Sequence, residues 1–188
     1  MKNLPDKKYQ IIYADPPWEY RDKKGDDPHL GGKTYPTMTL SNICALPVIS
    51  ITHDDSMLFL WATMPLLKEA LTVIEAWGFQ YITCAFVWVK VNPKGEGVYS
   101  GLGHWINGNA ELCLLGRKGN PIRFAKDVKQ IVFAPRQRHS AKPNEVRLRI
   151  LRLLGDLTRI ELFARPDNQL DFTGKTNLDG WDVWGNEI

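Results

Sequence analysis

The stretch YQIIYADPPW, residues 9–18, decides which fold the chain adopts. A short apolar run, residues 9–14, is followed at once by Asp15 and two prolines, so it predicts a buried strand that ends at an acidic turn. Each proline fixes its own φ and disfavours helix in the residue before it. A rigid turn with a carboxylate directly after a buried strand is typical of the ligand-binding edge of an α/β sheet.

The rest of the chain alternates between strand-like and helix-like segments. Further strands are predicted at residues 57–62, 80–89, 111–115, 130–134 and 158–163, with another short one near Trp181. Helices are predicted at residues 39–46, 64–77 and 143–154, where apolar residues recur with helical spacing. This alternation predicts an α/β domain with a mostly parallel sheet and helices on both faces.

Length and composition predict a single domain over residues 1–188, because 188 residues with 44% hydrophobic content can bury a full core. No uncharged apolar run is long enough to span a membrane, and the polar start does not resemble a signal peptide, so a cytoplasmic protein is expected. The cysteines lie far apart, so no metal site is expected. The polar segments 19–37 and 92–109 are predicted to be mobile loops that contact the substrate.

Charge is unevenly distributed, although the net charge is only +3. Residues 1–60 hold 7 Lys/Arg against 8 Asp/Glu, whereas residues 117–165 hold 13 Lys/Arg against 4 Asp/Glu. A basic block of this kind suits a polyanion such as nucleic acid, and an ordinary solvated surface is the alternative. The side chains expected to contact nucleic acid are Lys23, Lys24, Lys33, His104, Trp105, Arg123, Lys126, Lys129, Arg136 and Arg138.

The acidic turn suits chemistry on an amino group attached to a flat ring. Such an amine is a poor nucleophile, because its lone pair is delocalised into the ring. The Asp15 carboxylate and a carbonyl of Pro16 or Pro17 could accept its hydrogens, and placing the amine in line with a donor would supply most of the acceleration. Trp18 could stack on a base. Asp15, Pro16, Pro17 and Trp18 are therefore the candidate catalytic residues; a proline-rich turn with a core tryptophan is the structural alternative.

Five motifs in register resemble those of the N6-adenine methyltransferase family, which includes the catalytic subunit of the eukaryotic messenger-RNA adenosine methyltransferase and small phage and bacterial DNA methyltransferases. The resemblance extends from about Tyr9 to Glu187 and implies a Rossmann-like methyltransferase fold with a permuted motif order. The motifs are DPPW at 15–18, GLGHW at 101–105 with ELCLLG at 111–116 and KGNP at 118–121, HSAKP at 139–143, ELFAR at 161–165 and GNE at 185–187.

The same resemblance implies S-adenosyl-L-methionine as the cofactor. Lys142 is expected to bind its methionine carboxylate, helped by the helix that starts beside it. The cofactor-binding residues that the resemblance implies are Asp15, His139, Lys142, Glu161, Arg165, Asp167, Asn168, Asn186 and Glu187. Asp167 departs from the histidine of the eukaryotic enzyme, and Glu161 has an alternative reading as a strand-end acid paired with Arg165.

The expected reaction is methylation of adenine N6 in nucleic acid, where the base must be flipped out or already single-stranded. The lack of accessory domains and the likeness to phage and bacterial forms favour DNA as the substrate. Methylation of RNA and a non-catalytic binding subunit are the alternatives, although Asp15 and Lys142 are both present, as an active enzyme requires. The expected setting is a bacterial or phage-infected cell, and a homodimer is an assembly that the sequence leaves open.

Overall fold

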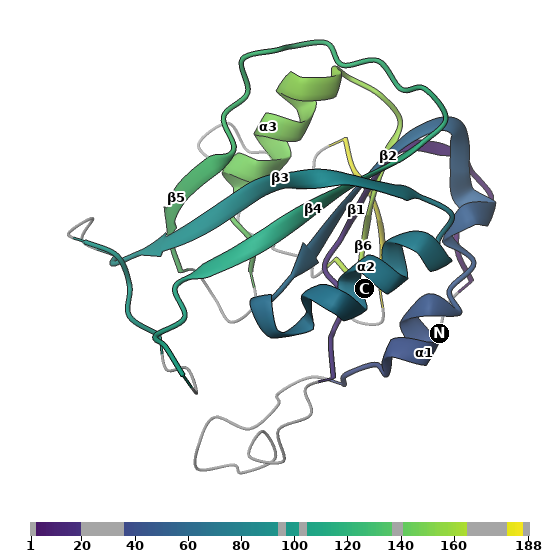
Figure 1. Cartoon of the computed structure of the whole chain (residues 1–188). Helices are drawn as coiled ribbons and strands as arrows, with labels where there is room; N and C mark the ends of the chain where they lie inside the picture. The colour runs from purple at the N-terminus through teal and green to yellow at the C-terminus, as the bar shows by residue number, and fades with distance from the viewer. Residues whose placement is uncertain are drawn as a thin grey trace.

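The computed structural model describes residues 3–19, 36–93, 97–101, 105–136, 141–164 and 180–185. The strands of this described part form one seven-stranded sheet with the order β5-β3-β4-β2-β1-β6-β7 (Figure 1). The strands are β1 Tyr9–Ala14, β2 Thr52–Ala62, β3 Gln80–Val91, β4 Ala110–Lys118, β5 Ile131–Pro135, β6 Arg159–Leu162 and β7 Asp182–Trp184. Every strand predicted from apolar runs is therefore confirmed, and β2 begins earlier than its apolar part suggested.

The three predicted helices are also present. α1 spans Leu40–Cys44, α2 spans Leu67–Ala76 after a 3-10 turn at Met64–Leu66, and α3 spans Asn144–Leu154. The side chain of Thr39 caps α1 by accepting a hydrogen bond from the N–H of Asn42. A second 3-10 turn, Val48–Ile51, follows α1 and leads into β2. No helix in the described ranges is long and apolar enough to cross a membrane.

The sheet is mixed, which corrects the expectation of a mostly parallel sheet. β4 runs antiparallel to both of its neighbours, β2 and β3, whereas the flanking pairs β1–β2, β1–β6, β6–β7 and β3–β5 are parallel. β4 follows β3 at the adjacent position of the sheet, and the described part of the connection between them contains no crossover helix. A polar segment such as 92–109 does not reveal which of the two connections it makes.

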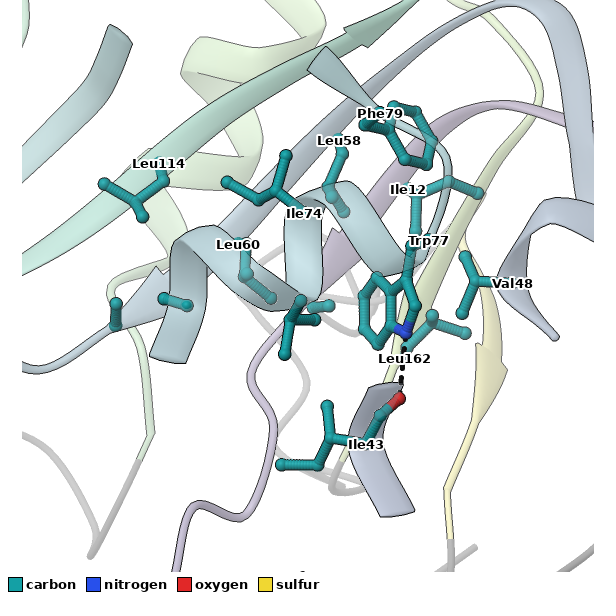
Figure 2. Packing of buried hydrophobic residues seen from close by; sticks show 14 of the residues in the cluster. Ile12, Ile43, Val48, Leu58, Leu60, Ile74, Trp77, Phe79, Leu114 and Leu162 are labelled. Carbon is teal, nitrogen blue, oxygen red and sulfur yellow. Dashed lines mark hydrogen bonds between the residues drawn. The ribbon is translucent and has the colours of Figure 1, made fainter. Parts of the chain in front are cut away.

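Helices cover both faces of the sheet, as expected, and each face has its own core. On one face, α1 and α2 pack over the central strands, where the indole N–H of Trp77 donates to the carbonyl of Ile43 at 2.9 Å (Figure 2). On the other face, α3 contributes Val146, Ile150 and Leu154 to a second core that includes Tyr13. The candidate catalytic strand β1 is buried between these two cores.

The pairing pattern brings the carboxyl ends of six strands to one edge of the sheet. Because β2 and β3 are both antiparallel to β4, they are parallel to each other, and β1, β5, β6 and β7 run the same way. β4 starts at this carboxyl edge and ends at the opposite, amino edge, where Lys118 lies beside Ser56. In Figure 1 the segment joining β4 to β5 accordingly crosses the end of the sheet away from the ends of β1 and β2.

Candidate active site

Asp15 stands at the carboxyl end of β1, in a turn that its own backbone stiffens. The N–H of Trp18 donates to the carbonyl of Pro16 at 2.8 Å, which closes a tight three-residue turn around Pro17. The N–H of Met38 donates to the carbonyl of Pro17, also at 2.8 Å. Both proline carbonyls are thus already hydrogen-bonded within the protein, although each carbonyl oxygen retains a second lone pair that can accept from a substrate.

The ring of Trp18 belongs to the core and not to the surface. Trp18 is 6% exposed and is part of the core beneath α1 and α2, and its indole N–H donates to the carbonyl of Trp61 at 3.2 Å. Trp18 is therefore a core tryptophan, which is the structural alternative to a residue that stacks on a base. Its indole anchors the turn to β2, and it presents no exposed face on which a base could stack.

A lysine lies between two carboxylates beside this turn. The ammonium of Lys142, just before α3, lies 2.7 Å from Oδ2 of Asp15 and 3.3 Å from Oε2 of Glu111. The other carboxylate oxygen of Glu111 is 2.6 Å from the ammonium of Lys90, on β3. The side chain of Lys142 is 9% exposed and also lies over the ring of Trp61 at 5.4 Å. The cluster combines cations and carboxylates in equal number at the carboxyl edge.

The environment changes how these groups hold their protons. Burial raises the pKa of the Asp15 carboxyl above its ordinary value, and the attraction of Lys142 offsets this only in part. Burial acts in the same direction on Glu111, but Lys142 and Lys90 outweigh it and lower the pKa of that carboxyl. Burial alone would lower the pKa of Lys142, yet the two carboxylates raise it above its ordinary value. Of the carboxyl groups of Asp15 and Glu111, the Asp15 carboxyl is therefore the one whose pKa lies above its ordinary value.

Glu161 forms a buried ion pair with Arg147, a residue that was not predicted from the sequence to belong to the site. Both oxygens of Glu161 accept hydrogen bonds from Arg147 of α3, each at 2.7 Å, and both side chains are buried. The guanidinium also lies 5.4 Å from the ring centroid of Tyr13, the neighbour of Glu161 across the β1–β6 pair. The reading of Glu161 as the partner of Arg165 is not tested, because Arg165 lies outside the described residues.

Strained backbone marks the end of β6, where cofactor contacts were expected. Phe163 has a φ of 62°, in the left-handed region that residues other than glycine rarely adopt. The N–H of Phe163 donates to the carbonyl of Trp184 at 2.6 Å, and the two rings meet edge to face at 5.5 Å. This turn lies directly before Ala164, where this described range ends. Such outliers concentrate at functional sites.

The predicted nucleic-acid contacts are divided between the two edges of the sheet. Arg136 follows β5 and lies at the carboxyl edge, where its guanidinium contacts Tyr99. Trp105 is 93% exposed in the segment that leads into β4 at this same edge. Arg123, Lys126 and Lys129 follow β4 and belong to the amino edge, and the N–H of Phe124 binds the carbonyl of Leu153 near the end of α3. Of the predicted contacts that the structure describes, Arg136 and Trp105 thus share an edge with Asp15, whereas the other three do not.

Many of the remaining predicted contacts lie outside the described residues, so the structure does not place them. Those expected to bind nucleic acid are Lys23, Lys24, Lys33, His104 and Arg138. Those expected to bind the cofactor are His139, Arg165, Asp167, Asn168, Asn186 and Glu187. Most of segment 19–37 and part of segment 92–109 are also outside these ranges, and the mobility expected of both segments stays a prediction.

Three charged residues of this region were not predicted as site residues. Arg147 precedes the apolar residues Ile150, Leu151 and Leu154 by three, four and seven positions, so it lies on the same face of the predicted helix. This spacing indicates a buried arginine that needs a buried partner. Glu111 lay within a quoted motif but carried no signal of its own. Lys90 ends an apolar strand and could have been found only from the pairing of β3 with β4.

The chain resembles known proteins over almost its whole length. A family model described as MT-A70 matches residues 9–187. M.MunI, a type II methyltransferase of Mycoplasma sp, is 38% identical over 98% of this chain and 80% of the relative. The human N(6)-adenosine-methyltransferase catalytic subunit METTL3 is 34% identical over 86% of this chain, and an MT-A70-like protein of Drosophila melanogaster is 33% identical over 86%. The chain spans about a quarter of the length of these two eukaryotic relatives, 26% and 25%.

Proposed function

Because this chain belongs to the MT-A70 family of S-adenosylmethionine-dependent N6-adenine methyltransferases, we propose that it is an active enzyme that methylates adenine in DNA. The likeness to the type II methyltransferase M.MunI, which extends over 98% of this chain and 80% of that protein, supports DNA over RNA. The human catalytic subunit METTL3 is matched over only 26% of its own length, and its likeness supports RNA as the second candidate. The observation that carries an active enzyme is the contact between Asp15 and Lys142 at the carboxyl edge.

The charged groups at this edge fit the cofactor. The ammonium of Lys142 has three N–H donors. Asp15 and Glu111 would take two of them, which leaves the third for the methionine carboxylate of the cofactor. Nη1 of Arg147 is buried and has no hydrogen-bond partner among the described residues, so it offers a further donor. When bound, the cofactor supplies an activated methyl group on a sulfonium. Lys142 would bind its carboxylate, and we propose that His139, Arg165, Asp167, Asn168, Asn186 and Glu187 complete the cofactor site.

Asp15 would act on the amino group of the target adenine. Its carboxylate can accept one N6 hydrogen while the carbonyl of Pro16, which retains a lone pair, accepts the other. Holding both hydrogens draws the nitrogen lone pair away from the ring and toward the methyl donor. The tight turn and the bond from Trp18 to Trp61 keep these acceptors fixed, so little reorganisation is needed when the base arrives.

Glu161 and Trp18 would support the site without touching the reacting atoms. Glu161 fixes Arg147 above Tyr13, and Trp18 anchors the catalytic turn. The acidic turn of β1 precedes the proposed cofactor side on α3 and β6, which supports a Rossmann-like methyltransferase fold with permuted motif order. The single seven-stranded sheet supports one domain over residues 1–188.

The decisive experiment is incubation with labelled S-adenosylmethionine and matched DNA and RNA oligomers, single- and double-stranded, followed by digestion and nucleoside analysis. We expect label in N6-methyldeoxyadenosine from DNA. Label confined to RNA adenosine would support the second candidate. Cofactor binding without transfer to any oligomer would contradict an active nucleic-acid methyltransferase.

A further inference from the structure

Tyr99 and Arg136 form a pair at the carboxyl edge that the proposed catalytic machinery does not include. Nη1 of Arg136 donates to the Tyr99 hydroxyl at 2.5 Å, and the guanidinium carbon lies 4.8 Å from the centroid of the tyrosine ring. Tyr99 is half-buried, whereas Arg136 is exposed. The ring therefore holds an exposed arginine in one orientation.

The backbone ties this pair to the charged cluster around Asp15. The N–H of Tyr99 donates to the carbonyl of Lys90 at 2.8 Å, and Val91 pairs with Val98 in an antiparallel bridge. The side chain of the same Lys90 contacts Glu111, which in turn contacts Lys142 beside Asp15. A continuous set of contacts thus links the arginine to the catalytic carboxylate. These contacts set the position of the pair relative to Asp15.

We propose that Tyr99 holds Arg136 as a phosphate-binding arginine that positions the strand carrying the target adenine. A guanidinium presents five N–H donors in a planar fork that matches phosphate oxygens, and the bond to Tyr99 uses one of them. The hydrogen bond and the contact with the ring restrain the guanidinium before the substrate arrives, which reduces the ordering cost of binding. This inference rests on the proposed function, because it assigns a contact for the nucleic-acid substrate of the same site.

The surroundings of the pair favour nucleic acid as the ligand. Val98, Trp105 and Ile106 are exposed apolar residues, 47%, 93% and 79%, in the segments that flank β3 and β4 at this edge. Flat or apolar surface beside a phosphate-binding cation is the combination that single-stranded nucleic acid uses. A target adenine that leaves the helix needs its flanking phosphates held, and a fixed arginine next to the catalytic cluster can hold one of them.

The test compares substitutions of the pair with a matched arginine at the other edge. Arg117, near the end of β4, is exposed and lies at the amino edge, so Arg117→Ala removes the same charge far from Asp15. The variants are Arg136→Ala, Arg136→Lys and Tyr99→Phe. For each, the Kd for a fluorescent DNA oligomer is measured over a range of salt concentrations, together with KM and kcat for methyl transfer and the Kd for S-adenosylmethionine.

For Arg136→Ala we expect about a tenfold weaker Kd and higher KM for DNA, with kcat and the cofactor Kd nearly unchanged. The slope of log Kd against log salt should fall by about one phosphate contact, roughly 0.7 to 0.9. Arg136→Lys should keep that slope but lose affinity, because the planar fork of donors is gone. Tyr99→Phe should lose affinity to a smaller extent, because the ring remains while the hydroxyl acceptor is lost.

Equal losses of DNA affinity in Arg136→Ala and Arg117→Ala would overturn the proposal, because affinity would then depend only on the total charge of the protein. An unchanged DNA affinity in Arg136→Ala would overturn it as well, and so would full affinity in Arg136→Lys, because the planar fork would then be irrelevant. Failure of the proposed function has a different signature. In that case the wild-type protein transfers no methyl group to any oligomer, whereas the binding comparison between the two arginines can still be made.

Discussion

Asp15 and Lys142, 127 residues apart in the sequence, lie 2.7 Å apart at the carboxyl edge of the sheet. β1 delivers the carboxylate, and the residue just before α3 delivers the ammonium. The pair is enclosed by Glu111 and Lys90, so both charges have partners in a largely buried position. Such a contact cannot be replaced on either side without changing the electrostatics of the whole cluster.

Asp15→Ala should abolish methyl transfer while cofactor binding remains. The carboxylate is the acceptor that holds the amino group, but the proposed anchor of the cofactor is the ammonium of Lys142. We expect a loss of at least about a hundredfold in kcat, in line with the removal of a group that acts on the reacting atoms. The measurement pairs single-turnover kinetics with calorimetry. Asp54→Ala is the control, because Asp54 is fully exposed at the start of β2. Turnover like that of the wild type would remove Asp15 from the chemistry.

Lys142→Ala should weaken the binding of S-adenosylmethionine by about tenfold to a hundredfold, which corresponds to the loss of one charge-assisted hydrogen bond to a carboxylate. Calorimetry measures this directly. Lys118→Ala is a suitable control, because Lys118 is an ion-paired lysine at the opposite edge. An unchanged Kd for the cofactor in Lys142→Ala would place the methionine carboxylate elsewhere.

The sequence was sufficient for parts of the fold and of the site that depend on local order. The apolar run before Asp15 predicted β1, and the residues Val146, Ile150 and Leu154 predicted α3, because burial on one face is visible in the spacing. The antiparallel course of β4 was not predictable, since no local pattern distinguishes a return connection from a crossover. The contacts of Lys142 with Glu111, and of Glu111 with Lys90, depend on that course. They were missed for the same reason.

Trp18 shows the opposite case, in which the sequence suggested an exposed position and the structure has a buried one. A tryptophan after two prolines suggested an exposed platform for a base. The indole instead lies beneath the turn, because its N–H reaches the carbonyl of Trp61 on the neighbouring strand and its ring fills the core. Sequence alone cannot tell on which side of a turn a large side chain lies.

The pH dependence of activity should reflect the raised pKa of Asp15. Its ordinary value is 3.8, and burial displaces it upward, so the protonated form persists to a higher pH than for a free aspartate. A protonated carboxyl accepts hydrogens poorly. As pH falls through this raised pKa, kcat/KM should therefore decline, and the midpoint of the decline should lie above pH 3.8. The measurement is a pH profile at saturating cofactor.

Burial is the largest cause of the raised pKa of Asp15, and Glu111→Gln tests a smaller one, the charge of Glu111. Glu111 and Glu161 each raise the pKa of Asp15, and Lys142 lowers it. Removing the charge of Glu111 should let Lys142 act more fully on Asp15, so the acidic limb of the profile should move to lower pH. A limb that moves to higher pH, or does not move, would show that Asp15 is not the titrating group.

Removing one partner of the Arg147–Glu161 pair should destabilise the fold. Both side chains are buried, and the bond is bidentate at 2.7 Å for each contact, so Glu161→Gln leaves a guanidinium charge inside the protein without its counter-charge. We expect a loss of about 3–5 kcal/mol in the free energy of unfolding, measured by urea denaturation. Arg152→Ala is the control: it removes an arginine of the same helix whose ion pair with Asp127 is exposed, and exposed pairs contribute little to stability. A double variant, Arg147→Leu with Glu161→Leu, should recover much of the lost stability, because no unpaired charge remains.

If Glu161→Gln is as stable as the wild type, the pair does not hold α3 against β6. Glu161 would then be better explained as a direct contact of the cofactor, and its substitution should weaken the binding of S-adenosylmethionine instead.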